Sequence, residues 1–326
     1  MANLVIGVGR SSRRAVRGRA GSTCHSCPVP TDSRLATAAP FLVLVGLLCQ
    51  EAGAAVAVMV FPQAGPVGMV ALRLAFSALV LLVLARRTLR GVTRAHWRLV
   101  AGYGLALAAM NVLFYLAIAR IPLGIAVTIE VLGPLTLSVV ASRSLRGLLW
   151  AATAAAGVLL LGGTAHDLDL LGVAFAAGAA LLWAVYILMA RAAGAAMPGL
   201  TGIALAMSVG AVVTLPAAFA VVGTALLDPA ILALGLAVAV LSSAIPYGIE
   251  ITALRHMRAE TFGVLMALAP ALAAVTGLVL LGQALTVSVA AGIVLVTVAG
   301  VGAVRTAPTP ARVEGPDDAP MPPSPA

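Results

Sequence analysis

The sequence predicts an all-α integral membrane protein with ten transmembrane helices, arranged as two inverted five-helix repeats. Three observations predict this fold class. The composition is strongly apolar, the chain divides into ten apolar segments of membrane-spanning length, and its second half weakly matches its first.

The composition excludes an ordinary soluble domain. Of the 326 residues, 62% are hydrophobic and only 10% are charged, and the mean hydropathy is +1.10. Soluble domains have roughly 45–50% apolar and about 25% charged residues. All 20 cationic residues are arginine, so the chain has no lysine for a Walker-A ATPase or for a Schiff base.

The spans follow from cutting the chain at charged and turn residues, because a helix needs about 20 apolar residues to cross the hydrocarbon core. The short links between the spans leave no room for a soluble domain. The ten predicted spans are Ala36–Val60, Pro66–Ala85, Leu99–Ile118, Pro122–Ala141, Leu145–Gly162, Leu170–Ala190, Gly199–Val222, Ala230–Ala253, Thr261–Leu281 and Thr286–Val304.

Polar segments flank the spans. We expect residues 1–35 to form a basic, disordered arm and the proline-rich residues 305–326 to form a disordered tail. The arm contains Cys24-His25-Ser26-Cys27, which resembles half of a zinc site but lacks a second pair of ligands. An unstructured arm is therefore the favoured interpretation, and no metal or other cofactor is predicted.

The arginines predict the orientation, because basic residues near the spans stay on the cytoplasmic side. All of them except Arg73 and Arg120 fall in the arm, the tail or links on the same side of the membrane. Both termini are therefore predicted to be cytoplasmic. The basic charge is a topology signal, so no nucleic-acid partner is predicted. The acidic outer link His166–Asp169 is interpreted as an ordinary turn.

The internal match predicts the repeat. Pro134 in Leu-Gly-Pro-Leu aligns with Pro270 in Leu-Ala-Pro-Ala, and Ala117-Ile118 aligns with Ala253-Leu254. The repeats are predicted at 36–163 and 164–304, and an odd number of spans in each would invert the second copy. Inverted repeats are typical of secondary transporters with a midplane site. Chance similarity between alanine- and glycine-rich segments is the alternative.

Polar residues of the first repeat share one depth. Glu130 and Arg73 lie about 12 Å and about 10 Å from the outer ends of their spans, and Asn111 and Glu51 lie at a similar depth. Buried charge is costly in a membrane and usually marks a pathway. The layer is interpreted as a site that holds both ends of a zwitterion and exchanges a proton. The alternative is a structural salt bridge from Arg73 to Glu130 or Glu51.

Prolines in the spans leave backbone carbonyl groups near these residues without hydrogen-bond partners. Pro134 and Pro270 leave the carbonyls of Glu130 and Met266 without their helical N–H partners. In the eighth span Tyr247 and Glu250 share a face with Ser243, although Glu250 lies close enough to the cytoplasmic end to be interfacial. The candidate substrate-binding or proton-coupling residues are Glu130, Arg73, Glu51, Asn111, Tyr115, Tyr247 and Glu250, with helix breaks at Pro134, Pro246 and Pro270.

The run from Met110 to Pro134, MNVLFYLAIARIPLGIAVTIEVLGP, closely resembles the EamA branch of the drug/metabolite transporter superfamily. Supporting stretches are VALRL at 70–74, LWAVYIL at 182–188, LSSAIPYGIE at 241–250, TFGVLM at 261–266 and PALAA at 270–274. The similarity covers about residues 40–304. It implies two inverted five-helix halves in a bacterial inner membrane and proton-driven efflux of small amino acids such as threonine or homoserine.

The chain departs from that resemblance at two positions. Relatives often carry a glutamate before the proline of the ninth span and another in a Gly-Glu pair at its end, where this chain has Ala269 and Gln283. Any proton-carrying role of those carboxylates would fall on Glu130 first and on Glu51 second.

Other functions remain as alternatives. They are efflux of another small metabolite or a drug by the same fold, a membrane-embedded enzyme, and a structural subunit. An enzyme is not favoured because the four histidines are scattered and none lies within a predicted span. The predicted partners are a small-molecule substrate, protons and the lipid bilayer, and the sequence leaves a homodimer open.

Overall fold

The computed structural model describes residues 33–89, 92–142, 144–162, 169–246, 249–250, 253, 257 and 259–306, and these contain helices and no strand. The Cys24–Cys27 motif and Tyr247 lie outside the described residues. The helices are α1 Ser33–Ala85, α2 His96–Ile118, α3 Leu123–Glu130, α4 Leu132–Ser142, α5 Leu145–Gly162, α6 Leu170–Ala196, α7 Thr201–Val222, the 3₁₀ turn η2 Gly223–Leu227, α8 Pro229–Ala239, the π-turn η3 Val240–Ala244, α10 Ala259–Met266, α11 Ala269–Leu281 and α12 Val287–Thr306.

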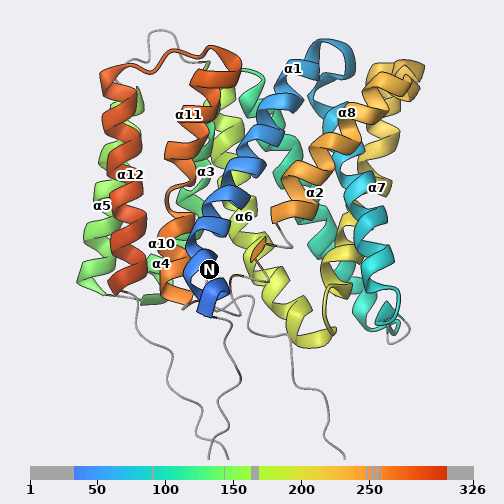
Figure 1. Ribbon diagram of the computed structural model, residues 1–326, viewed down its shortest axis with the longest axis horizontal. Helices are drawn as coiled ribbons and strands as arrows, with labels where there is room; N and C mark the ends of the chain where they lie inside the picture. Colours follow the sequence, from blue (N-terminus) through green and yellow to red (C-terminus); the bar gives the residue numbers. More distant parts are fainter. Residues whose placement is uncertain are drawn as a thin grey trace, which may run out of the picture.

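The first two predicted spans are the two arms of α1. A straight helix of 53 residues would be about 80 Å long, far more than the roughly 30 Å of a hydrocarbon core. The chain turns back at Gly65, whose φ of 62° lies in the region that favours glycine, between Pro62 and Pro66. Figure 1 shows the two arms running in opposite directions. We call them the first arm and the second arm.

Three of the other predicted spans are not single α-helices. The fourth is divided into α3 and α4 after Glu130, because Pro134 has no N–H to donate to the Glu130 carbonyl. The ninth is divided into α10 and α11 between Met266 and Ala269, just before Pro270. The eighth begins as α8 and changes to the π-turn η3 ahead of Pro246.

The molecular surface suits a lipid environment. Six of the described helices are long and apolar enough to cross a membrane, and three shorter apolar segments lie at 123–137, 145–160 and 229–244. Large apolar side chains such as Leu159, Leu181 and Val279 are exposed on the outside. Alanine and glycine fill many of the interfaces between helices, where small residues allow backbones to approach closely.

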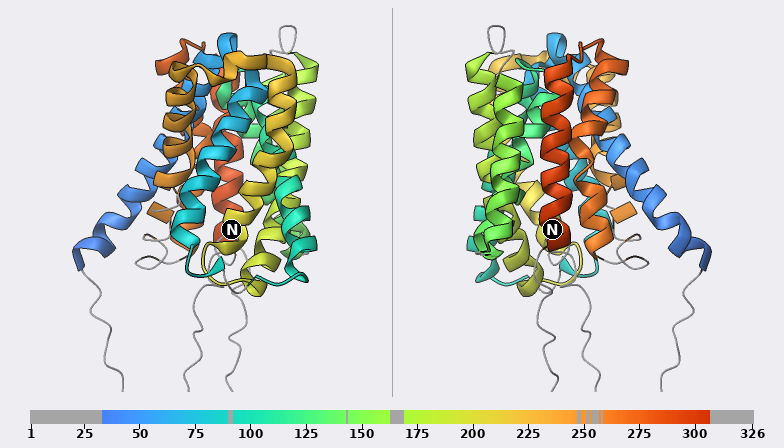
Figure 2. Two further views of the ribbon diagram at one scale, coloured as in Figure 1. Left: turned by 90° about the vertical axis from the view of Figure 1, so that its right-hand side faces the viewer. Right: turned by 90° about the vertical axis from the view of Figure 1, so that its left-hand side faces the viewer.

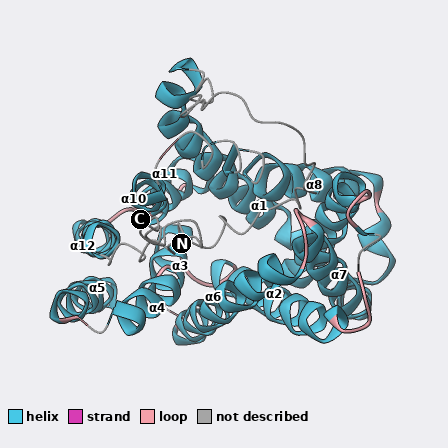
Figure 3. Cartoon of the chain, turned by 90° about the horizontal axis from the view of Figure 1, so that it is seen from below, coloured by secondary structure: helices cyan, strands magenta, loops and turns pink. Residues whose placement is uncertain are grey.

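The helices form an elongated bundle. Seen from below, α5 and α12 lie at one end and α7 at the other, with α6 and α2 along one side and α11, α1 and α8 along the other (Figure 3). The start of α1 leans away from the other helices at the lower edge (Figure 2). The main pairings join α1 with α7 and α8, α2 with α6 and α7, α3 with α11, and α5 with α12. Residues far apart in the chain are therefore brought together in the interior.

One close approach should be sensitive to a single methyl group. A Cβ at Gly133 in α4 would overlap the backbone oxygen of Ala180 in α6, which cannot move as a side chain can. We expect Gly133→Ala to cost about 1–3 kcal/mol of stability, as overpacking does. At Gly102, where nothing lies within 4 Å of the added Cβ, the same change should be neutral or stabilising. Thermal unfolding of the two purified variants measures the difference, and equal melting temperatures would contradict this packing.

Candidate functional site

Arg73 lies at the centre of a polar cluster that joins three parts of the chain. Its Nη1 donates to Asn111 Oδ1 at 3.0 Å and to the Tyr115 hydroxyl at 3.4 Å, both on α2. Its Nη2 donates to the backbone oxygen of Ser242 in η3 at 3.4 Å. Asn111 is itself oriented by a 2.8 Å bond from its Nδ2 to the oxygen of Leu107. The structure therefore brings together Arg73, Asn111 and Tyr115, which the sequence placed among the candidates.

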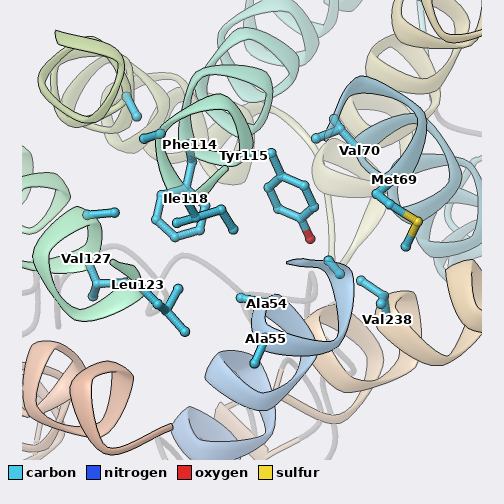
Figure 4. Packing of buried hydrophobic residues seen from close by; sticks show 14 of the residues in the cluster. Ala54, Ala55, Met69, Val70, Phe114, Tyr115, Ile118, Leu123, Val127 and Val238 are labelled. Atoms are coloured by element: carbon cyan, nitrogen blue, oxygen red, sulfur yellow. The ribbon is translucent and has the colours of Figure 1, made fainter. Parts of the chain in front are cut away.

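Tyr115 supports this cluster through its ring. The residue is fully buried, and its ring lies 5.8 Å from the Phe61 ring and 5.8 Å beneath the Arg73 guanidinium carbon. Apolar side chains of several helices surround it (Figure 4). Those labelled in the figure are Ala54, Ala55, Met69, Val70, Phe114, Ile118, Leu123, Val127 and Val238. This packing holds the phenol oxygen next to the guanidinium.

Glu51 and Glu130 approach the cluster from two other segments. Glu51, on the first arm, is only 2% exposed, and Glu130 is the half-buried last residue of α3. Arg73 is close enough to interact electrostatically with both carboxyl groups, and Glu130 with Glu51. Neither carboxylate forms an ion pair with Arg73, since Arg120–Asp169 is the only ion pair among the described side chains. The structural salt bridge weighed from the sequence is therefore not formed.

The π-turn η3 supplies groups that are not among the candidate residues, although the sequence did place Ser243 on one face with Tyr247 and Glu250. Pro246 has no N–H to donate to the carbonyl of Ser242, four residues earlier, and this carbonyl accepts from Arg73. The hydroxyls of Ser242 and Ser243 are buried and have no hydrogen-bond partner among the described residues. The same holds for Ser77, one helical turn after Arg73 on the second arm. Two spacings in the sequence could have indicated these groups. Pro246 follows Ser242 by four residues, and Ser77 follows Arg73 by four residues.

Two polar contacts lie at the starts of α3 and α6. Arg120 Nη1 binds Asp169 Oδ2 at 2.8 Å, and Asp169 also caps α6 by accepting from the N–H groups of Leu171 and Gly172. The Leu123 N–H donates to Gln283 Oε1 at 2.9 Å. Asp169 is thus more than part of an ordinary turn. The Gln283 side chain thus binds the start of α3.

The remaining candidate, Glu250, is separate from these contacts. It is half-buried, at a helical position beyond η3, and no hydrogen bond or ion pair joins it to another described residue. No group of three or more His, Cys, Asp or Glu side chains lies close enough to hold a metal ion within the described ranges.

Comparison with known proteins gives consistent results. Residues 170–305 match the model of the EamA-like transporter family. The threonine/homoserine exporter RhtA of Salmonella typhimurium is 41% identical over 251 residues, which are 76% of this chain and 85% of that protein. The exporter of the same name from Escherichia coli is 39% identical over 248 residues, which are 75% of this chain and 84% of that protein.

A solved crystal structure shares the fold. It superposes with a TM-score of 0.55 at 20% identity, over 83% of this chain and 98% of that chain.

The Arg120–Asp169 pair predicts a pH dependence. The hydrogen bond from Arg120, together with the backbone bonds from Leu171 and Gly172, lowers the pKa of Asp169 below its ordinary 3.8. The stabilisation is therefore present above the unfolded-state pKa and lost as the pH falls through the lowered value. Asp169→Asn keeps a capping oxygen but removes the charge. We expect it to lower the melting temperature slightly at about pH 7, and by progressively less as the pH is lowered below about 4. A deficit that does not shrink as the pH falls would contradict this assignment.

Proposed function

Because the chain belongs to the EamA-like transporter family, we propose that it is a multi-pass inner-membrane secondary transporter that exports small amino acids such as threonine or homoserine. Membership of that family makes it a transporter rather than an enzyme. The identity to exporters of that substrate class supports this substrate over the alternative, another small metabolite or a drug. We also propose that export is driven by protons moving inward.

The helix pairing supports two inverted halves, 36–163 and 164–304, with ten spans. The two arms of α1 count as two spans, and α3 with α4, α8 with η3, and α10 with α11 each count as one. A relation that exchanges the halves would map the α5–α12 pair onto itself, and likewise the contact of the second arm with α7. It would also map the contact of the first arm with η3 onto the α2–α6 contact. Residues 1–35 and 305–326 would flank the halves on the cytoplasmic side.

The observation that carries the proposal is a guanidinium that is only partly used, beside two carboxylates that it does not pair with. Arg73 has five N–H donors, and three hold oxygens of the protein, so two remain for a substrate carboxylate. Glu51 and Glu130 can then divide the other two tasks, holding the substrate ammonium and carrying the proton. An amino acid presents both of the charges that this arrangement accepts.

We propose Glu130 as the principal proton carrier and Glu51 as the second. The second half lacks carboxylates at Ala269 and Gln283, and Gln283 is occupied with the Leu123 N–H. Glu130 lies at the junction of α3 and α4, so a change in its charge acts where Pro134 already interrupts the helical hydrogen bonding. Glu250 would be interfacial, and Tyr247 stays a candidate substrate contact.

Uptake into inverted membrane vesicles tests the proposed function. Labelled threonine and homoserine should accumulate in vesicles that contain the protein when a proton gradient, acidic inside, is imposed, and accumulation should stop when the gradient is collapsed. Vesicles without the protein give the background. Accumulation that ignores the gradient would contradict proton coupling, and failure of both amino acids to enter would contradict the substrate class.

Glu130→Gln should abolish gradient-driven uptake while the protein still inserts in the membrane. Glutamine keeps the size and hydrogen bonding of glutamate but cannot exchange a proton. Asp228→Asn is the matched control, because asparagine can still cap α8 as Asp228 does. Gradient-driven uptake at the wild-type rate in the Glu130 variant would remove Glu130 from the proton pathway.

The proposed topology places both termini in the cytoplasm. α1 begins and α12 ends at the same lower edge, while α5 ends and α6 begins at the upper edge (Figure 1). In a cysteine-free background, a cysteine in place of Asp167 should react with an impermeant maleimide in intact cells. A cysteine in place of the exposed Thr93 should react only after permeabilisation. The reverse pattern would invert the topology.

A further inference from the structure

Two neighbouring serines in the π-turn η3 have hydroxyls that the fold does not use. Ser242 is 4% exposed and Ser243 is 2% exposed, and neither Oγ has a hydrogen-bond partner among the described residues. A buried hydroxyl without a partner costs free energy, and more so where no water is at hand. We therefore expect these hydroxyls to form hydrogen bonds with a bound molecule.

Most hydroxyls elsewhere in the helices avoid this cost. A serine or threonine in a helix commonly donates to the carbonyl four residues earlier. The described helices contain six such bonds, from Thr128, Thr136, Thr153, Ser208, Thr214 and Thr306. Besides the two serines, the buried hydroxyls of Ser77, Thr276 and Thr297 have no partner among the described residues. Ser242 and Ser243 make no such bond, and they lie where the α-helical hydrogen bonding changes to the π pattern. Such π-turns are frequent at functional sites.

The serines lie beside the group that would hold the substrate carboxylate. Arg73 Nη2 is 3.4 Å from the backbone oxygen of Ser242. On the other side, the first arm reaches η3 at Gly53, where a Cβ would overlap the Ser242 hydroxyl. Because this residue has no side chain, the Ser242 hydroxyl can lie directly against the first arm. An amino acid bound to Arg73 through its carboxylate would therefore have its side chain within reach of this turn.

We propose that the hydroxyls of Ser242 and Ser243 recognise the hydroxyl of the substrate side chain and so determine specificity. This inference rests on the function proposed above. A serine hydroxyl both donates and accepts, so the pair can bind a hydroxyl on either of two adjacent carbons of a flexible side chain. A substrate with a methyl group in the same place would leave these hydroxyls unpaired. The site would therefore select hydroxylated amino acids over apolar ones of the same shape.

Competition between isosteric amino acids tests the inference. Valine has the shape of threonine with a methyl group for the hydroxyl, and norvaline is related to homoserine in the same way. In inverted vesicles, unlabelled threonine should compete with labelled threonine at least about tenfold better than valine does. The Ser242→Ala/Ser243→Ala double variant should lose about tenfold of this preference, and the homoserine-to-norvaline preference should fall likewise.

A matched control variant and a stability measurement distinguish a loss of substrate recognition from a general loss of folding. Ser208→Ala removes a hydroxyl that is already bonded to the oxygen of Ala204, so it should keep the wild-type preference. Without substrate, the purified double variant should melt no lower than the wild type, because it loses hydroxyls that had no partner. Threonine should raise the melting temperature of the wild type but not that of the double variant.

The outcomes distinguish this inference from the function on which it rests. If the wild type carries neither threonine nor homoserine, the proposed function fails. If the wild type carries them and the double variant keeps the wild-type preference, the function stands and the role of the serines is overturned. A double variant that melts well below the wild type would also overturn it, because the hydroxyls would then have partners within the folded protein.

Discussion

A guanidinium in the interior of a membrane protein must find its partners within the protein, and this constraint organises the structure around Arg73. The group stays charged, and exposing it to lipid is costly. Its partners come from α2 and from the π-turn η3, more than 160 residues later in the chain. Arg73 thereby links the first half of the chain to the second. A guanidinium can act as a binding group inside the membrane only where the protein also supplies hydrogen-bond acceptors for it.

The local elements of this arrangement were predictable from the sequence. The number of residues from the outer ends of their spans predicted that Arg73 and Asn111 lie at one depth. The hydrogen bond between their side chains agrees with that prediction. The prolines indicated where α3 and α11 would be separated from their neighbours, because a missing N–H has a local effect. The turn at Gly65 was likewise marked by its flanking prolines. Each of these features depends on residues within a few positions of one another.

The contacts between the halves were not predictable in the same way. The Ser242 carbonyl accepts a hydrogen bond from Arg73 because two distant segments pack together. No pattern in a single sequence indicates this packing. Glutamine at position 283 reads as a lost carboxylate, yet its side-chain oxygen accepts from the Leu123 N–H at the start of α3. The same packing keeps Arg73 from pairing with either glutamate, an outcome that the shared depth alone left undecided. A guanidinium beside two carboxyl groups with which it forms no ion pair suits a ligand that carries both charges.

The central claim is that the Arg73 guanidinium binds the substrate carboxylate while it holds the halves together. Arg73→Lys tests this most directly, because lysine keeps the charge but loses the planar fork that matches a carboxylate. Uptake of labelled threonine into inverted vesicles is measured for this variant and for Arg87→Lys, an exposed position at the end of α1. The account predicts that kcat/KM falls by about 10–100-fold in the Arg73 variant and stays unchanged in the Arg87 variant. A wild-type apparent affinity for threonine in the Arg73 variant would contradict it.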